Sequence, residues 1–238
     1  MRNFKQCLNY FKVYFGIVFT LICFFSIIGY IFIKGAKSLT PEFLFSLNAS
    51  EGASLVPMFA TTIIVVILTL LISVPIGIGS AIYLNEYARP NSIYVKIIRI
   101  AIETLSGIPS IIYGLFGFLF FVLKLGWDWS IISGVFTLSI MILPIIISSS
   151  EEALKTVPEG YREGSFALGA GKFETIIRVV LPSAISGILA SVILSVGRIV
   201  GEVAALTLTA GTLVGFPSSL FESSSTLAVY MYTIVLQG

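Results

Sequence analysis

Thirty consecutive residues, Leu55 to Leu84, carry no charged side chain. As a helix they would be about 45 Å long, which exceeds the hydrocarbon core of a bilayer, so the run is best interpreted as a membrane span. The rest of the chain agrees, because 57% of its 238 residues are hydrophobic, 11% are charged and the mean hydropathy is +1.03. We therefore expect an all-α polytopic membrane protein with little room for a soluble domain.

Five apolar runs of spanning length alternate with polar segments. The runs are residues 13–33, 55–84, 100–125, 131–149 and 183–209. Lys and Arg favour the cytoplasmic side of a membrane. The segments 1–12, 85–99 and 151–182 hold three, three and four of these cations, whereas 34–54 and 124–130 hold two and one. This asymmetry predicts five crossings, a cytoplasmic N-terminus and an outer C-terminus.

The first run follows a basic start, as the apolar part of a signal peptide does. Its 21 residues, Val13 to Ile33, are long for a signal peptide, and no small-residue cleavage pattern follows them. We interpret this run as an uncleaved first span. The chain 1–238 then forms one transmembrane domain, in which residues 1–54 are the first span with an outer segment and 55–238 are the core.

The polar segment 151–182 lies between two apolar runs and has to lie in water. Pro158 suits the first turn of a helix, so we expect a helix from about Pro158 to Leu168. The glycines at 169 and 171 end that helix, and a second one is expected from about Lys172 to Val180, stopping at Leu181-Pro182. Two short helices joined by a glycine elbow indicate a docking surface. The alternative is an ordinary cytoplasmic loop.

Small residues recur in the third apolar run. They stand at steps of three, four and three and would line one helical face: Gly107, Ser110, Gly114 and Gly117. Such a face allows two membrane helices to approach closely. We favour this packing role over a role in substrate binding.

Two further polar or breaking positions lie in or beside the spans. Pro75, in the second run, is expected to bend or break the helix near its cytoplasmic end, most simply as a packing kink. Glu103 lies about one turn inside the third run, four residues after Arg99. The spacing predicts an ion pair between the two at the membrane surface.

Arg198 is the one cation placed within a predicted span, with Glu202 four residues later on the same helical face. A charged residue inside the bilayer is costly unless it is paired or faces a cavity, which makes it a functional candidate. The planar guanidinium also matches the oxygens of phosphate. One hypothesis places Arg198 and Glu202 on the substrate path. The other makes them a structural pair that locks helices together, and the two are compatible.

The composition argues against several functions. The chain has no histidine, which disfavours metal-dependent chemistry, and we expect neither a metal site nor catalytic residues. The stretch from Ala170 to Phe173 resembles the end of a P-loop but lacks its first Gly and its Ser/Thr. We therefore expect no cofactor or nucleotide bound by this chain and no enzymatic activity. A membrane enzyme, a channel and a signalling scaffold remain as disfavoured alternatives, and no nucleic-acid partner is expected.

The spacing within segment 151–182 resembles the EAA loop of binding-protein-dependent ABC importer permeases. That family's pattern is E-A-A, three residues, G, nine residues, I, one residue, L-P. Here it is matched by Glu163, Gly164, Ser165, Gly169, Val179, Leu181 and Pro182. Gly164 and Ser165 replace the alanines and Val179 replaces the isoleucine, which are conservative changes. The resemblance implies that these residues couple the membrane domain to an ATPase.

Three further stretches resemble the phosphate-importer permeases of the PstA type, a MetI-like family. They are VPIGIGSAIYLNEYA (74–88), ETLSGIPSIIYGLFG (103–117) and GRIVGEVAALTLTAG (197–211). The resemblance implies the transmembrane domain of a type I ABC importer in a bacterial cytoplasmic membrane. Its partners would be membrane lipid, a second homologous permease, a dimer of ATP-binding subunits and an external phosphate-binding protein. The family's chains continue into another span, so we expect a sixth helix to be missing here.

The substrate implied by this resemblance is phosphate. A permease for another oxyanion, such as molybdate, sulfate or phosphonate, is the alternative. A membrane path for any of these anions needs only a cation and hydroxyl groups, and selectivity could reside in the external binding protein.

Overall fold

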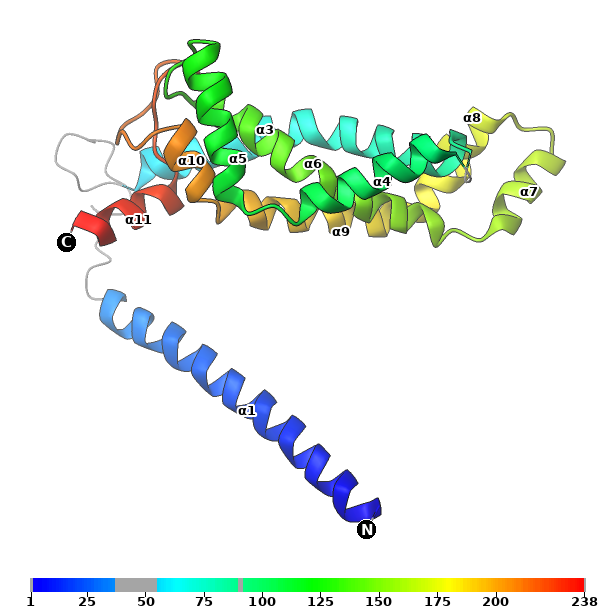
Figure 1. The fold of residues 1–238 in the computed structure, drawn as a ribbon, viewed down its shortest axis with the longest axis horizontal. Helices are drawn as coiled ribbons and strands as arrows, with labels where there is room; N and C mark the ends of the chain where they lie inside the picture. Colours follow the sequence, from blue (N-terminus) through cyan, green and yellow to red (C-terminus); the bar gives the residue numbers. More distant parts are fainter. Residues whose placement is uncertain (1, 37–54, 90–91, 238) are drawn as a thin grey trace. The chain divides into compact units, whose positions relative to one another are not determined.

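The computed structural model describes residues 2–36, 55–89 and 92–237, and the regular elements within them are all helical (Figure 1). The chain divides into two compact units, Met1–Ser54 and Leu55–Gly238. The first contains α1 (Arg2–Gly35), whose apolar part from Lys12 to Gly35 is long enough to cross a membrane, as predicted. From residue 37 to residue 54, the predicted outer segment lies outside the described residues.

The second unit is built around α6 (Ile131–Lys155), which packs against both α3 (Val56–Ile82) and α9 (Leu181–Val200). The three helices run side by side along the unit in Figure 1. Helix α6 contributes more residues to the main buried cluster than any other helix: Ile131, Val135, Leu138, Met141, Ile142 and Ile146. Because α6 is surrounded by other helices on several sides, its apolar residues are distributed around the whole helix and do not form a single stripe.

Glycines let the neighbours approach α6 closely. A Cβ added at Gly77 of α3 would lie 2.6 Å from a methyl group of Ile146, and one at Gly187 of α9 would lie 2.6 Å from the Cβ of Ala153. Both distances are shorter than real contacts, so these glycines are required by the helix separation. This is the small-residue packing that membrane helices use.

The third predicted span is sharply bent. It consists of α4 (Ile93–Ser106) and α5 (Ser110–Gly117), the latter continuing as the π-helix η4 (Phe118–Lys124), with an angle of 99° between the two halves. The break at residues 107–109 combines a flexible glycine with Pro109, which supplies no amide donor. The prediction that Gly107 shares a helical face with Gly114 and Gly117 is therefore wrong, because Gly107 lies in the break.

Two prolines have less effect than expected. Pro75 lies inside the continuous α3, and the helix that begins at Lys172 runs through Pro182 into α9 without stopping. Before Pro182 the helix widens into one π-helical turn, η5 (Ile176–Val180), in which the amide of Leu181 donates to the carbonyl of Ile176. A wider turn lessens the clash between a proline ring and the preceding turn, so the predicted stop at Leu181-Pro182 does not occur.

The fifth predicted span ends early. Helix α9 stops at Val200, and after residues 201–203 the chain forms the short α10 (Ala204–Thr209) and later α11 (Leu227–Gln237). At the other boundary, α6 extends to Lys155, beyond the predicted end at Ser149. Within the described residues, four helices are long and apolar enough to cross a membrane, or five if the bent pair counts as one. Five is the predicted number of crossings.

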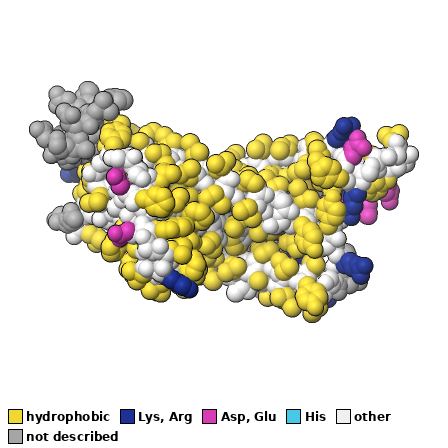
Figure 2. Space-filling model, turned by 90° about the horizontal axis from the view of Figure 1, so that it is seen from above, with side chains coloured by type: hydrophobic (Ala, Val, Ile, Leu, Met, Phe, Trp, Pro, Cys, Tyr) yellow, Lys and Arg dark blue, Asp and Glu magenta, His cyan; other side chains and the backbone are white. Residues whose placement is uncertain are grey.

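The surface agrees with a membrane location. Figure 2 shows hydrophobic side chains over the middle of the visible face, with Lys, Arg, Asp and Glu gathered toward its ends. Many of the hydrophobic residues on α3, α4, α5 and α9 are exposed, for example Ile67, Leu71, Ile97, Leu115 and Ile193. In a soluble protein such a surface would be unusually apolar, whereas in a bilayer it faces lipid or other membrane helices.

Candidate coupling loop and transport path

The polar segment forms a helical hairpin at one end of the second unit (Figure 1). Its first helix is α7 (Glu159–Ala167), which follows Pro158 as predicted, and its second is α8 (Lys172–Thr175), which continues into η5. No residue of α7 is buried. Most of its side chains are therefore available to a partner.

Gly169 ends α7 in the manner expected of a glycine elbow. Its φ is +85°, a conformation that glycine adopts without strain. The Gly169 amide donates to the carbonyl of Phe166 at 2.9 Å, and the Ala170 amide donates to the carbonyl of Ser165 at 3.2 Å. This pair of bonds is a Schellman motif, which requires the left-handed residue at this position. The predicted elbow is confirmed.

The first three motif residues lie on α7. Glu163 and Gly164 are exposed, and a Cβ added at Gly164 would meet no atom within 4 Å. The family's alanine would thus fit here, and the glycine is not required by packing. Ser165 is half-buried, and its hydroxyl forms a 2.9 Å hydrogen bond with the buried hydroxyl of Thr175, which ties the two helices of the hairpin together.

The last three motif residues join the hairpin to the membrane helices. Val179 is half-buried in η5, and Leu181 packs against a core cluster formed by α6, α9 and the end of α3. Pro182 is exposed. A displacement of the hairpin would therefore reach this cluster directly through η5.

Four large apolar or aromatic side chains of the hairpin are exposed: Tyr161, Phe166, Leu168 and Phe173. Leu168 is the extreme case, with 91% of its surface exposed. They lie among charged residues at an end of the molecule that has to be in water. An apolar patch with a charged rim is typical of a protein–protein interface.

Arg162, which the sequence reasoning did not select, holds the hairpin in place. Its guanidinium forms an ion pair with Glu86 at 2.8 Å and donates to the carbonyls of Leu154, at 3.2 Å, and Val157, at 2.9 Å. Glu86 belongs to the π-helix η3 (Tyr83–Tyr87), which continues α3. No sequence pattern relates residues that are 76 positions apart, so the pair could not have been predicted from spacing.

Arg99 does not pair with Glu103, and that prediction is wrong. The Arg99 guanidinium instead lies 2.8 Å from the carboxylate of Glu151 on α6. The same carboxylate also forms an ion pair with the Lys155 ammonium at 2.8 Å. Glu151 is buried, and two cations offset the cost of removing its charge from water. Glu103 is exposed and forms no ion pair within the described part of the chain.

Arg198 and Glu202 are not the predicted pair. Because α9 stops at Val200, Glu202 lies in the break and its carboxylate accepts the amide of Ala205 at 3.1 Å, in the first turn of α10. Only 8% of Glu202 is exposed. Arg198 is half-buried in the last turn of α9 and forms neither an ion pair nor a hydrogen bond with another described residue. Their role on a substrate path stays a prediction.

The bent third span contacts α10. A Cβ added at Gly114 of α5 would lie 2.7 Å from the backbone of Ala205 in α10. The Tyr113 hydroxyl donates to the carbonyl of Leu105 at 2.9 Å, across the bend between α4 and α5. In membrane proteins, interrupted helices inside the apolar region are tolerated where they are buried in protein or line a cavity.

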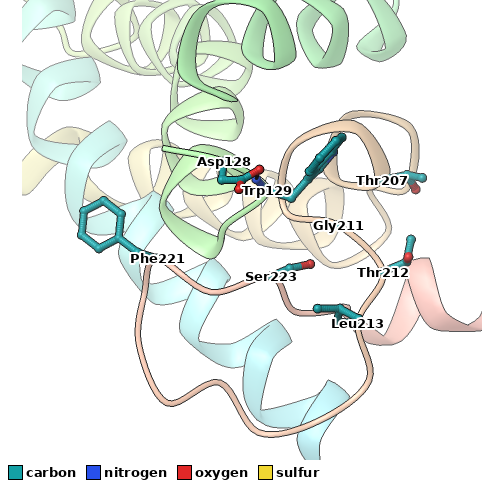
Figure 3. Close-up of a pocket in the computed structure, with 8 residues that line it drawn as sticks. All are labelled: Asp128, Trp129, Thr207, Gly211, Thr212, Leu213, Phe221 and Ser223. Atoms are coloured by element: carbon teal, nitrogen blue, oxygen red, sulfur yellow. Dashed lines mark hydrogen bonds between the residues drawn. The ribbon is translucent and has the colours of Figure 1, made fainter. Parts of the chain in front are cut away.

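A pocket of about 550 Å³ opens at the end of the unit opposite the hairpin. Figure 3 shows its lining, which includes Asp128, Trp129, Thr207 and Phe221. The carbonyl of Asp128 accepts hydrogen bonds from the hydroxyls of Ser130, at 3.3 Å, and of Ser133 in α6, at 3.1 Å. The φ of Asp128 is +57°. A carboxylate at the mouth of this pocket repels anions, so we do not assign an anion site here.

The chain resembles a described family over most of its length. The family profile named "Binding-protein-dependent transport system inner membrane component" matches residues 73–236, which include the hairpin and the bent span formed by α4 and α5. In fold, the chain is similar to the inward-facing MetNI methionine ABC transporter, with a TM-score of 0.55 and 20% identity over 75% of this chain and 78% of that one. At this identity the likeness establishes the fold alone, and it is the predicted fold of a MetI-type importer domain.

Curated relatives agree with this match. The probable ABC transporter permease protein YqgI of Bacillus subtilis is 34% identical over 88% of this chain and 76% of that one. The phosphate transport system permease protein PstA homolog of Mycoplasma genitalium is 38% identical over 82% of this chain and 31% of that one. PstA 1 of Mycobacterium tuberculosis is 37% identical over 55% of this chain and 42% of that one. The chain thus spans about three quarters of the first relative and less than half of the other two.

Proposed function

The chain belongs to the binding-protein-dependent transport system inner membrane components and resembles PstA-type permeases, and on this premise we propose that it is the transmembrane subunit of an ATP-driven phosphate importer. It forms the translocation path with a second, homologous permease. ATP is bound and hydrolysed by a separate dimer of cytoplasmic subunits, and an external binding protein delivers phosphate. The chain lies in a bacterial cytoplasmic membrane with its N-terminus in the cytoplasm.

The exposed hairpin is the observation that carries this proposal. Helix α7 has no buried residue, and Leu168 and Phe173 offer apolar side chains at a charged, water-exposed end. The Schellman motif at Gly169 sets the angle between the hairpin's helices, and Leu181 connects it to the membrane core. A surface of this kind serves a permease whose energy comes from another subunit.

Phosphate as the substrate is supported by the relatives that are named phosphate transport permeases, and by Arg198. A guanidinium in the last turn of α9, without an ion pair in the described part of the chain, suits transient binding of an oxyanion. Its lack of a carboxylate partner leaves the charge free for the passing ion.

The test is uptake by the reconstituted complex. The chain is combined with its companion permease, ATPase and binding protein in proteoliposomes, and ATP-dependent uptake of radiolabelled phosphate is measured. We expect uptake that excess unlabelled phosphate suppresses and that equal molybdate, sulfate or phosphonate does not. Suppression by one of those anions at lower concentration than phosphate would assign the importer to that anion instead.

A further inference from the structure

The hairpin is attached to more than its two neighbours in the chain. A helix of nine residues, such as α7, is too short to be stable alone and needs tertiary contacts to keep its orientation. It has no buried residue that could supply them by packing. Its orientation therefore depends on a small number of polar contacts, of which those of Arg162 are the most extensive.

The contact between Arg162 and Glu86 is well shielded. Both Nε and one Nη of Arg162 donate to the Glu86 carboxylate, and the exposed fractions of the two side chains are 17% and 9%. The other Nη of the guanidinium donates to the carbonyl of Val157, two residues after α6, and the Nη that contacts Glu86 also donates to the carbonyl of Leu154 in α6. A bidentate pair that is largely removed from water is stronger and more directional than an exposed one.

A second contact joins the other helix of the hairpin, α8, to η3. The Lys172 ammonium lies 4.9 Å from the ring centre of Tyr87, which is the residue after Glu86 in η3. The start of α7 and the start of α8 are thus both held by η3. A π-helical turn such as η3 is uncommon and is often found at functional positions in helices.

The helix behind η3 extends through the whole unit. Helix α3 has 27 residues, about 40 Å, and at its far end the Thr61 hydroxyl bonds the buried hydroxyl of Ser224 at 2.7 Å. The Thr62 hydroxyl there also accepts the amide of Leu227 at 3.0 Å. Helix α3 therefore links the hairpin at one end to the segment 224–227 at the other.

We infer that Glu86 and Arg162 form a coupling latch: this ion pair fastens α7 to α3, so that a movement imposed on α7 by the ATPase displaces α3 along with α6 and α9. The two residues are positioning residues and touch neither substrate nor nucleotide. The inference rests on the proposed function, because it takes α7 as the surface that receives the ATPase. Without the latch, α7 moves while α3 stays behind, and ATP is hydrolysed with little transport.

The experiment compares Glu86→Gln with a matched control in the reconstituted complex. Glu174→Gln breaks the other ion pair of the hairpin, Glu174–Arg178, which is exposed and lies within one helix at 2.8 Å. Three quantities are measured: co-purification with the ATPase, ATP hydrolysis, and anion uptake per ATP hydrolysed. We expect Glu86→Gln to assemble and hydrolyse ATP, with uptake per ATP lowered on the order of tenfold, whereas Glu174→Gln keeps the normal ratio.

Two results would overturn the latch. One is a normal ratio of uptake to hydrolysis in Glu86→Gln. The other is a parallel loss of assembly, hydrolysis and uptake in both Glu86→Gln and Arg162→Lys, which would assign the pair to folding alone. If Glu86→Gln assembles poorly, Arg162→Lys provides the second reading, because it keeps the charge but loses the bidentate geometry and should lower the ratio less. The ratio is measured with whichever anion the wild-type complex imports, so a wrong substrate assignment does not affect the test.

Discussion

Replacing Gly169 by alanine would test whether the shape of the elbow determines docking. The φ of Gly169 is +85°, and an added Cβ would meet no atom within 4 Å. The penalty is therefore purely conformational, about 1–2 kcal/mol for an ordinary L-residue in the left-handed region. Valine should cost more than alanine because it is β-branched, and asparagine should cost less because it tolerates this conformation.

The structure also sets an upper limit to this effect. The backbone at residue 169 can escape the strain by abandoning the two hydrogen bonds of the Schellman motif, at 2.9 and 3.2 Å. Each is worth about 1 kcal/mol net, so the penalty cannot much exceed about 2 kcal/mol. If the ATPase binds only the native elbow, its affinity for the permease falls by up to about 30-fold.

Gly164 provides a control of opposite sign. It lies in the same hairpin, is exposed, and also has no atom within 4 Å of an added Cβ, but its conformation is helical. Alanine is favoured over glycine in a helix by about 0.8–1 kcal/mol. We expect Gly164→Ala to stabilise α7 and to leave docking intact or improved, while the same substitution at Gly169 weakens it.

The assay is a titration of the purified permease complex with the ATPase, combined with hydrogen exchange of the amides at residues 168–170. Gly169→Val should show weaker binding and faster exchange of these amides, with normal membrane insertion. If Gly169→Val and Gly164→Ala bind the ATPase equally well, the elbow is not a determinant of docking and the reasoning fails.

Three further predictions concern the membrane region. Arg198→Lys should lower phosphate uptake about tenfold and Arg198→Gln more severely, with assembly unchanged, because only arginine offers a planar fork to an oxyanion; normal uptake in Arg198→Gln would remove Arg198 from the path. Gly117→Val should disrupt folding, since an added Cβ would collide with Thr137 and Thr209, whereas Gly79→Val has open space and should fold and insert normally. Size-exclusion chromatography of the detergent-solubilised variants, which separates monodisperse from aggregated protein, checks both outcomes. A cysteine at the exposed Ser219 should react with impermeant thiol reagents outside whole cells, and one at Thr156 should not; the reverse pattern would invert the topology.

The sequence predicted what depends on local chemistry. Hydropathy located the spans, and the glycine at 169 was correctly assigned to a helix end because positive φ is a property of the residue itself. The same holds for the start of α7 after Pro158. The order of the elements and the position of the exposed hairpin follow from these local signals.

What the sequence could not supply depends on contacts between distant segments. The 99° bend between α4 and α5 does not alter hydropathy, so the third span looked continuous. The end of α9 at Val200 moved Glu202 off the helical face that it was expected to share with Arg198. Arg99 forms its ion pair with Glu151 on α6 and not with Glu103, which is only four residues away in the sequence. No sequence pattern predicts a partner that is so distant along the chain.

The exposure of Leu168 and Phe173 has a consequence for the biogenesis of the transporter. If α7 docks a cytoplasmic ATPase as proposed, a copy of this subunit synthesised without that ATPase displays both side chains to the cytosol, together with a helix that has no buried residue. Cytosolic chaperones and membrane proteases recognise such segments, so an orphan copy should be degraded faster than an assembled one. The cellular lifetime of the subunit should then depend on the supply of its ATPase, which pulse-chase measurements with and without the ATPase would test.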